Sequence, residues 1–270
     1  MNVFNKLRVL ALAGSLVLTI NCSKNSDDPV ETDPGGIDKT GNLLATGDSA
    51  HDILANDTFT KLLIEIDYVS GFQPSMEAMN NLQAFLQART FKQDIEILYD
   101  ELPSPNEDDL SLQEIANLET GNRTVYNDGT TLAIYIYFAD APSVDDDPIE
   151  GTVTLGAVYR NTSMIIHEST VRKLALQSNQ VTIADVETAT LNHEFGHLLG
   201  LVNLGTTPVN DHEDPNAIHH CDIQGCIMSA ELQFGSGIMG ILNRRVAKET
   251  AAVPGLDAEC ILDLQQNGGR

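Results

Sequence analysis

Apolar and polar residues follow one another in patterns that predict a β-sheet in the middle of the chain. In residues 61–68 the side chains of Leu62, Ile64 and Ile66 share one side, as in a half-buried strand. The run Leu-Ala-Ile-Tyr-Ile-Tyr-Phe within 131–139 has no charge, which indicates a central strand buried on both faces. Strands are therefore predicted at 61–68, 94–99, 131–139, 152–159 and 164–168.

Helical patterns alternate with these strands. A helix is predicted to follow the first strand, with Met76, Met79 and Leu86 as its buried stripe. Ser111 and Glu114 have the spacing of a capping box and begin a second helix. Strands that alternate with helices in this way predict a layered α/β unit.

The longest predicted helix covers residues 182–199, and Thr182 and Asp185 stand at its capping positions. Beyond Gly200 no regular period persists, so loops are expected until a last helix at 257–266. The fold class expected from these patterns is α/β (α+β), with a smaller irregular C-terminal part that ends in a helix.

The N-terminus has the features of an export signal. Lys6 and Arg8 precede an apolar run at 9–20 that is too short to span a bilayer comfortably. The run ends near Cys22, and the arrangement resembles a bacterial lipoprotein signal, which implies a signal peptide at 1–21 and lipid on Cys22. We therefore expect an exported protein, anchored by lipid at the outer membrane or cell surface. A simply cleaved signal would instead give a periplasmic or secreted protein.

Charge and composition divide the rest of the chain and exclude some partners. Acidic, Pro and Gly residues predict a flexible tether at 22–58, followed by one domain at 59–270 with subdomains at 59–200 and 201–270. The chain has 15 basic and 39 acidic residues, a net charge of −24, which repels nucleic acids and anionic lipids. Membrane contact is thus expected only through lipid, and we expect a monomer.

The candidate chemistry begins with His193-Glu194-Phe195-Gly196-His197 near the end of the long helix. Residues four apart stack on one helical face, so His193 and His197 can hold one metal ion together. Glu194 points about 100° away from His193 around the helix and can act on a water molecule instead. This is the His-Glu-x-x-His arrangement of zinc peptidases, in which Glu194 is the general base.

With Gly200 and the downstream Met228, this motif resembles the metzincin clan of metallopeptidases over residues 61–266. The resemblance implies a zincin fold with a mixed twisted sheet and an active-site helix. It implies one catalytic Zn²⁺, a methionine turn at Met228 and a protein or peptide substrate. It also implies that residues 156–160 form an antiparallel edge strand along the cleft, where a substrate peptide pairs as an extra strand.

The chain departs from the metzincin pattern at the third histidine, because Asn203 occupies that position and an amide is a poor zinc ligand. His220 precedes Cys221 with the spacing seen in archaemetzincins. His212, followed by acidic residues, looks more like the adamalysins. We favour His220 because its spacing to the methionine turn needs no gap, and we keep His212 as the alternative.

The cysteines offer two interpretations. Cys221 and Cys226 are close in sequence and predict a disulfide, as expected of an exported protein, with Cys260 as a buried thiol in the last helix. A bridge between Cys226 and Cys260 is the alternative. Counterparts of Cys221 and Cys226 bind a structural zinc in archaemetzincins, but the later Cys-x-x-Cys pair of that family is missing here.

Other functions stay open at this point. The acidic loop around Asp211, Glu213 and Asp214 could hold Ca²⁺, although a solvated turn is the simpler interpretation because the ligands have no regular spacing. The leading hypothesis is a zinc endopeptidase. A catalytically silent surface lipoprotein that binds proteins is the main alternative, supported by Asn203, and a zinc-scavenging lipoprotein is another.

Overall fold

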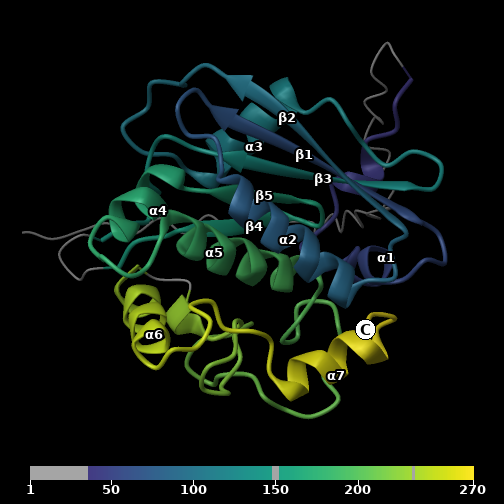
Figure 1. The fold of residues 1–270 in the computed structure, drawn as a ribbon. Coiled ribbons are helices and arrows are strands. Elements are labelled where there is room, and N and C mark those ends of the chain that lie inside the picture. The colour runs from purple at the N-terminus through teal and green to yellow at the C-terminus, as the bar shows by residue number, and fades with distance from the viewer. Residues whose placement is uncertain (1–35, 148–151, 233–234) are drawn as a thin grey trace, which may run out of the picture. The chain divides into compact units, whose positions relative to one another are not determined.

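A five-stranded mixed β-sheet forms the frame of the molecule (Figure 1). The computed structural model describes residues 36–147, 152–232 and 235–270. The strands follow the spatial order β2-β1-β3-β5-β4, and the first four run parallel. Their bounds are β1 Lys61–Val69, β2 Asp94–Leu102, β3 Thr131–Phe138, β4 Gly156–Arg160 and β5 Ser163–Ile166.

The edge of the sheet at β4 has the arrangement that the metzincin resemblance implied. β4 pairs antiparallel with β5, and the pairing register shifts between Val158 and Arg160. β4 has no second neighbour among the described strands, so one row of its backbone groups is unpaired within the sheet.

Helices cover both faces of the sheet and fill the C-terminal part. Ser111 and Glu114 form the predicted capping box of α3, and Thr182 and Asp185 form that of α5. The helix bounds are η1 Thr40–Asn42, α1 Ala50–Leu54, α2 Met76–Arg89, α3 Leu112–Asn122, α4 Glu168–Ala175, α5 Ile183–Leu198, η2 Ala230–Leu232, α6 Gly235–Ala247 and α7 Ala258–Gln266.

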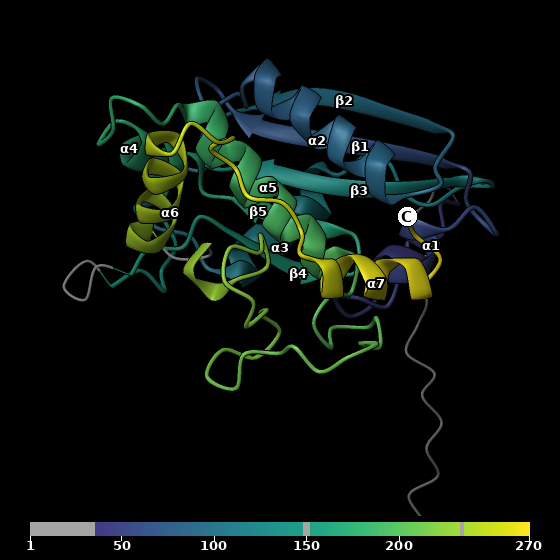
Figure 2. The ribbon, with the colours of Figure 1, turned by 60° about the horizontal axis from the view of Figure 1, so that its bottom comes forward.

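Two apolar clusters lie on the two faces of the sheet. The larger one joins alternate residues of the strands, such as Ile64 and Ile134, to α2 and α5. The smaller one joins Tyr135, Tyr137 and the α3 residue Ile115 on the other face. Because β3 contributes to both clusters, it is buried on both faces, as its uncharged sequence predicts. In Figures 1 and 2 α6 and α7 lie on the side of α5 away from β2.

Several elements differ from the prediction. The strand expected at 152–159 begins only at Gly156, and the one expected at 164–168 ends at Ile166 because α4 starts at Glu168. Met76 was expected in the buried stripe of α2, but its position in the first turn leaves it 60 % exposed, while Met79 and Leu86 are buried.

The ordered fold also begins earlier than expected. Part of the range predicted as a tether, 22–58, forms η1 and α1, and Ile53 and Leu54 are fully buried in the larger cluster. The predicted signal peptide and the lipidation site Cys22 lie outside the described residues. None of the helices in the described ranges is long and apolar enough to cross a membrane.

Candidate metal centre

Helix α5, which carries the His-Glu-x-x-His motif, is buried over residues 186–198, so these side chains lie inside the protein. Its capping box fixes the start of the helix, and His193 and His197 follow one turn apart on one face. The side chain of His193 is fully buried and that of His197 is 5 % exposed. The helix thus delivers two imidazoles to one point at its C-terminal end.

His220 joins these two imidazoles from the irregular segment after the helix. The ring centroid of His220 lies 5.3 Å from the ring centroid of His193 and 5.2 Å from that of His197. One potential ligand atom from each of the three histidines lies within 4.8 Å of the others. The structure therefore brings together the two motif histidines and the favoured third one.

Hydrogen bonds fix the tautomers of two of these rings. Nδ1 of His193 contacts the carbonyl oxygen of Ile227 at 2.8 Å, and Nδ1 of His220 contacts that of Ile218 at 2.9 Å. A carbonyl oxygen can only accept, so each Nδ1 donates its proton. In a neutral ring this leaves a lone pair on Nε2, which is the atom that a metal needs.

These features fit a zinc ion. Nε2 of His193 and Nε2 of His197 lie 3.2 Å apart. Two nitrogen ligands of a tetrahedral zinc, each about 2.0–2.1 Å from the ion, are about 3.3 Å apart. Burial, together with the neighbouring His220, lowers the pKa of His193 to about 4, and burial lowers the pKa of His197 as well. Both rings are therefore neutral near pH 7 and able to bind a cation.

Glu194 lies beside the three histidines and is buried. Burial raises the pKa of its carboxyl to about 8, while a hydrogen bond from the backbone of Val158 on β4 opposes that rise. Its Oε2 atom has no hydrogen-bond partner within the described part of the chain. A side chain on Gly156 would lie 2.8 Å from Cγ of Glu194, so the close approach of β4 and α5 requires a glycine there.

A small cavity opens in front of these groups, with a volume of about 160 Å³. One wall is the edge strand and the other is α5 with the His220 loop. The lining residues are Ala157, Val158, Glu194, His197, Leu204, Ile218, His219 and His220. Two of the candidate metal ligands, His197 and His220, thus share one space with the Glu194 carboxyl and the strand edge.

Met228 lies directly beneath the helix and is fully buried. Its side chain contacts the helix at Gly196, between the two motif histidines. The preceding residue, Ile227, supplies the carbonyl that holds His193. The segment around Met228 therefore packs against the helix between the motif histidines and orients one of them.

The other candidate ligands lie elsewhere. The Asn203 amide donates to Glu213 over 2.6 Å. His212, the alternative third ligand, is buried with Nε2 at 2.8 Å from Asp263 and Nδ1 at 3.3 Å from the sulfur of Cys221. His212 thus belongs to a different cluster from the three histidines.

That second cluster is built from the cysteines. The predicted disulfide between Cys221 and Cys226 is absent, because all three cysteines of the described residues are free, buried thiols. The alternative bridge is absent too, with the sulfurs of Cys226 and Cys260 3.6 Å apart. Ligand atoms of four residues lie within 4.8 Å of one another: His212, Cys221, Asp257 and Cys260.

Sequence reasoning missed part of this cluster. It treated Cys260 as a buried thiol, or as the partner of Cys226 in a disulfide, and gave no role to Asp257 or Asp263. Asp257 caps α7 by accepting hydrogen bonds from Glu259 and Cys260, and it faces Cys221 at 3.2 Å. The Asp257-x-x-Cys260 spacing, which puts both at the start of one helix, was the available signal.

The acidic loop has ordinary hydrogen bonds. The Glu213 carboxylate accepts from Asn203 and from the backbone of His219, and that of Asp214 accepts from the backbone of Asn216 at 2.8 Å. These N–H donors occupy the carboxylate oxygens that calcium would need, so the loop offers no support for a calcium site.

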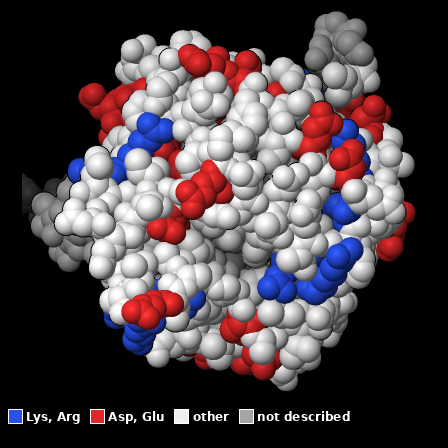
Figure 3. Space-filling model, in the orientation of Figure 1, with Lys and Arg blue, Asp and Glu red and all other residues white. Residues whose placement is uncertain are grey.

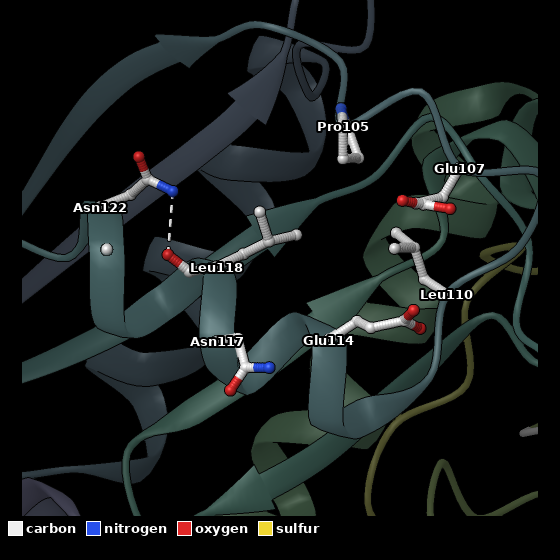
Figure 4. Close-up of a pocket in the computed structure, with 8 residues that line it drawn as sticks. Pro105, Glu107, Leu110, Glu114, Asn117, Leu118 and Asn122 are labelled. Carbon is white, nitrogen blue, oxygen red and sulfur yellow. Dashed lines mark hydrogen bonds between the residues drawn. The ribbon is translucent and has the colours of Figure 1, made fainter.

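Another pocket lies on the opposite face of the sheet, beside α3 (Figure 4). Its volume is about 340 Å³, and Glu107 and Glu114 face it together with apolar side chains. It has no histidine or cysteine in its lining, so its residues do not form a site of the kind described above.

Comparisons with known proteins give distant likenesses. No protein-family profile and no curated protein sequence matches the chain. The archaemetzincin from Methanopyrus kandleri is similar at 13 % identity and a TM-score of 0.44, covering 78 % of this chain and 96 % of that one. Metalloproteinase-II from Bacteroides fragilis is similar at 13 % identity and a TM-score of 0.36, covering 79 % of this chain. The chain matches about half of that protein, 54 % of its length.

Proposed function

We propose that this protein is a zinc-dependent endopeptidase. His193, His197 and His220 hold the ion, and Glu194 serves as general base. The observation that carries the proposal is the convergence of three imidazole nitrogens within 4.8 Å of one another beside a buried carboxyl. A catalytic zinc site uses three protein ligands and keeps a fourth position open, which matches this donor set.

The metal, the Glu194 carboxyl and two backbone carbonyls would have separate roles in peptide hydrolysis. A zinc ion held by His193, His197 and His220 would supply Lewis acidity, which activates water and polarises a carbonyl. The positive charge of the ion would lower the pKa of Glu194 from the value of about 8 that burial gives it. The ionised carboxylate would then take a proton from the attacking water and pass it to the leaving amine. The carbonyls of Ile227 and Ile218 keep two of the imidazoles in the tautomer and orientation that binding requires.

The edge strand β4 supports a peptide as the substrate class. Its outer backbone groups are unpaired within the sheet, and Ala157 and Val158 line the cavity. An extended peptide that adds to this edge would lie across the histidines with its backbone held by main-chain hydrogen bonds. On the face drawn in Figure 3 acidic and basic side chains are scattered over a largely uncharged surface. We therefore expect recognition through backbone pairing at β4 rather than through a patch of one charge.

We further propose that the second cluster holds a structural metal. Cys221, Cys260 and His212 supply three ligand atoms, and Cys226 or Asp257 supplies the fourth. Asp263 accepts a hydrogen bond from the far nitrogen of His212, which is how carboxylates orient metal-binding histidines. Sulfur-rich sets of this kind favour zinc.

Metal analysis and peptide hydrolysis on the same preparation test the endopeptidase. The wild-type protein should contain zinc and cleave casein or a quenched peptide. Glu194→Gln should keep the zinc and lose about 10²- to 10⁴-fold in turnover, because it removes only the base. Glu107→Gln, an exposed carboxyl, is the matched control. The absence of both zinc and turnover would favour the silent-binding alternative, and exchangeable zinc without turnover would favour the zinc-scavenging one. Turnover by Glu194→Gln above a tenth of wild type would reject the base.

A further inference from the structure

The loop that presents His220 is closed on itself by backbone contacts. Glu213 and Cys221 form an antiparallel bridge at its two ends, and the Asp214 N–H donates to the His220 carbonyl over 2.7 Å. His219 adopts a left-handed conformation with φ 63°, which turns the chain sharply just before the imidazole. The direction of His220 is therefore set by the geometry of this turn.

One carboxylate ties this turn to the end of the active-site helix. Oε1 of Glu213 accepts a hydrogen bond from the backbone N–H of His219 over 2.7 Å. Its other oxygen, Oε2, accepts from the side-chain amide of Asn203 over 2.6 Å. Two donors on separate segments thus share one carboxylate, and both bonds are short enough to fix the positions of their donors.

Asn203 lies in the turn that follows α5, which ends at Leu198, at a point where the chain reverses. Val202 and Asn203 both have positive φ values, 54° and 63°. Asparagine is among the residues that tolerate this conformation, because its short polar side chain can bond locally. A second contact joins the same elements, since Nδ1 of His219 lies 3.3 Å from the Val202 carbonyl.

We propose that Asn203 is a positioning residue for the third metal ligand: through Glu213 it braces the His219–His220 backbone against the end of α5. The inference rests on the proposed metal centre. Asn203 occupies the sequence position of a metzincin's third histidine, and the brace gives that residue a use other than coordination. The helix end and the His220 loop are thereby aligned in the protein itself.

The physical benefit is preorganisation. A ligand on a free loop loses backbone and side-chain freedom when it binds, whereas a braced loop has already lost part of it. Partners behind metal ligands commonly contribute about 10- to 100-fold in metal affinity. Because Asn203 is exposed and acts through a second residue, we place its effect near the lower end of that range.

An exchange of donor and acceptor tests the brace. Asn203→Asp puts two carboxylates against each other and should weaken zinc binding at the three-histidine site about tenfold. Glu213→Gln should stay close to wild type, because its amide oxygen still accepts from His219 and Asn203 can flip to present its own oxygen. The double variant Asn203→Asp, Glu213→Gln restores one donor and one acceptor, and should recover most of the lost affinity.

Two further variants separate the hydrogen bond from other effects. Asn203→Gly keeps the left-handed backbone but deletes the amide, and should weaken zinc binding roughly threefold or more. Asn106→Asp is the matched control, because Asn106 is also exposed with φ 59°. Within the described residues, its side-chain amide bonds only to the nearby Ser104 carbonyl. It should bind zinc like wild type.

The measurements are zinc titration of the full chain and hydrogen exchange of the His219 amide in metal-free protein. Asn203→Asp should speed that exchange, and the double variant should slow it again. Unchanged zinc affinity and unchanged exchange in Asn203→Asp, or a double variant no better than that single one, overturns the brace. A wild-type protein that binds no zinc at the three histidines overturns the proposed function instead, and the metal-free exchange still decides the brace.

Discussion

The sulfur of Met228 lies in the space that a side chain on Gly196 would need. A Cβ built on Gly196 would come within 2.0 Å of the Met228 Sδ and 2.9 Å of its Cε. Gly196 lies between His193 and His197 on α5, and Met228 is fully buried. The helix and the segment around Met228 thus approach so closely that only glycine fits.

Gly196→Ala should therefore destabilise the protein even though alanine favours helices. The methyl group forces Met228 out of a packed position, and overpacking of this kind costs about 1–3 kcal/mol. Because the same movement disturbs Ile227, which holds His193, zinc affinity should fall as well. Thermal unfolding with and without zinc measures both effects.

Gly121→Ala is the matched control for that substitution. Gly121 lies in α3, and a Cβ there would meet nothing within 4 Å. This variant should be neutral or stabilised by up to about 1 kcal/mol, as expected when alanine replaces glycine in a helix. Equal changes in melting temperature for Gly196→Ala and Gly121→Ala would contradict the close contact between Met228 and the helix.

Replacement of the two competing histidines should have separate consequences. His220→Ala should lose the catalytic zinc and hydrolysis together, because it removes one of three ligands. His212→Ala should keep hydrolysis but lose the second metal and stability, since it leaves Asp263 buried without its imidazole. Zinc stoichiometry by mass spectrometry, with activity, distinguishes them. If His212→Ala loses activity and His220→Ala retains it, the third ligand is His212.

A buried carboxyl makes stability depend on pH. Burial, helped by the nearby Glu187 charge, raises the pKa of Glu168 from 4.5 to about 9. The folded state therefore binds the proton more tightly than the unfolded state. The stability due to this group is complete below about pH 4.5 and is lost as pH rises toward 9, by up to about 1.4 kcal/mol per pH unit.

Glu168→Gln should remove that dependence, since glutamine stays neutral and can still accept from Arg172. The melting temperature of the variant relative to wild type should rise between pH 5 and pH 8.5. Glu107→Gln, on the surface, should show no such trend. A relative melting temperature that falls over this interval would contradict the assignment.

Cys22→Ser should release the protein from membranes. The charged start, the apolar run and the acidic stretch after Cys22 predict lipid on this residue. Without acyl chains a protein of net charge −24 is repelled by anionic lipid surfaces. Fractionation and mass spectrometry of the mature N-terminus measure this. A wild-type protein without acyl mass would end the lipoprotein hypothesis.

The sequence predicted those elements whose local signals agree. α5 has a capping box and a repeating apolar face, and β3 has a long uncharged run, so both appear where expected. α6 was missed because Gly235, Gly237 and Gly240 weaken its helical pattern, and tertiary packing overrides that weakness. α1 was missed because it has only five residues in an otherwise polar region.

Only the site residues that lie on a single helix, α5, could be predicted from the sequence. His193, Glu194 and His197 follow from spacing along α5. The place of His220 depends on how the loop after Asn203 closes, through contacts such as the Glu213–Cys221 bridge that no local pattern announces. The thiol cluster depends likewise on α7 packing against the His212 segment, which brings Asp257 and Cys260 to Cys221. The disulfide predicted between Cys221 and Cys226 from their closeness in sequence is not formed.

The separation of His197 and His220 along the chain has a consequence for resistance to proteolysis. A metal ion held by both would act as a cross-link that closes the intervening irregular segment into a loop. Like a disulfide, such a closure restricts the unfolded ensemble and suppresses local opening. Removal of the metal by a chelator should therefore make residues 201–219 susceptible to an added protease before the sheet is cleaved. Added zinc should restore the resistance of this segment.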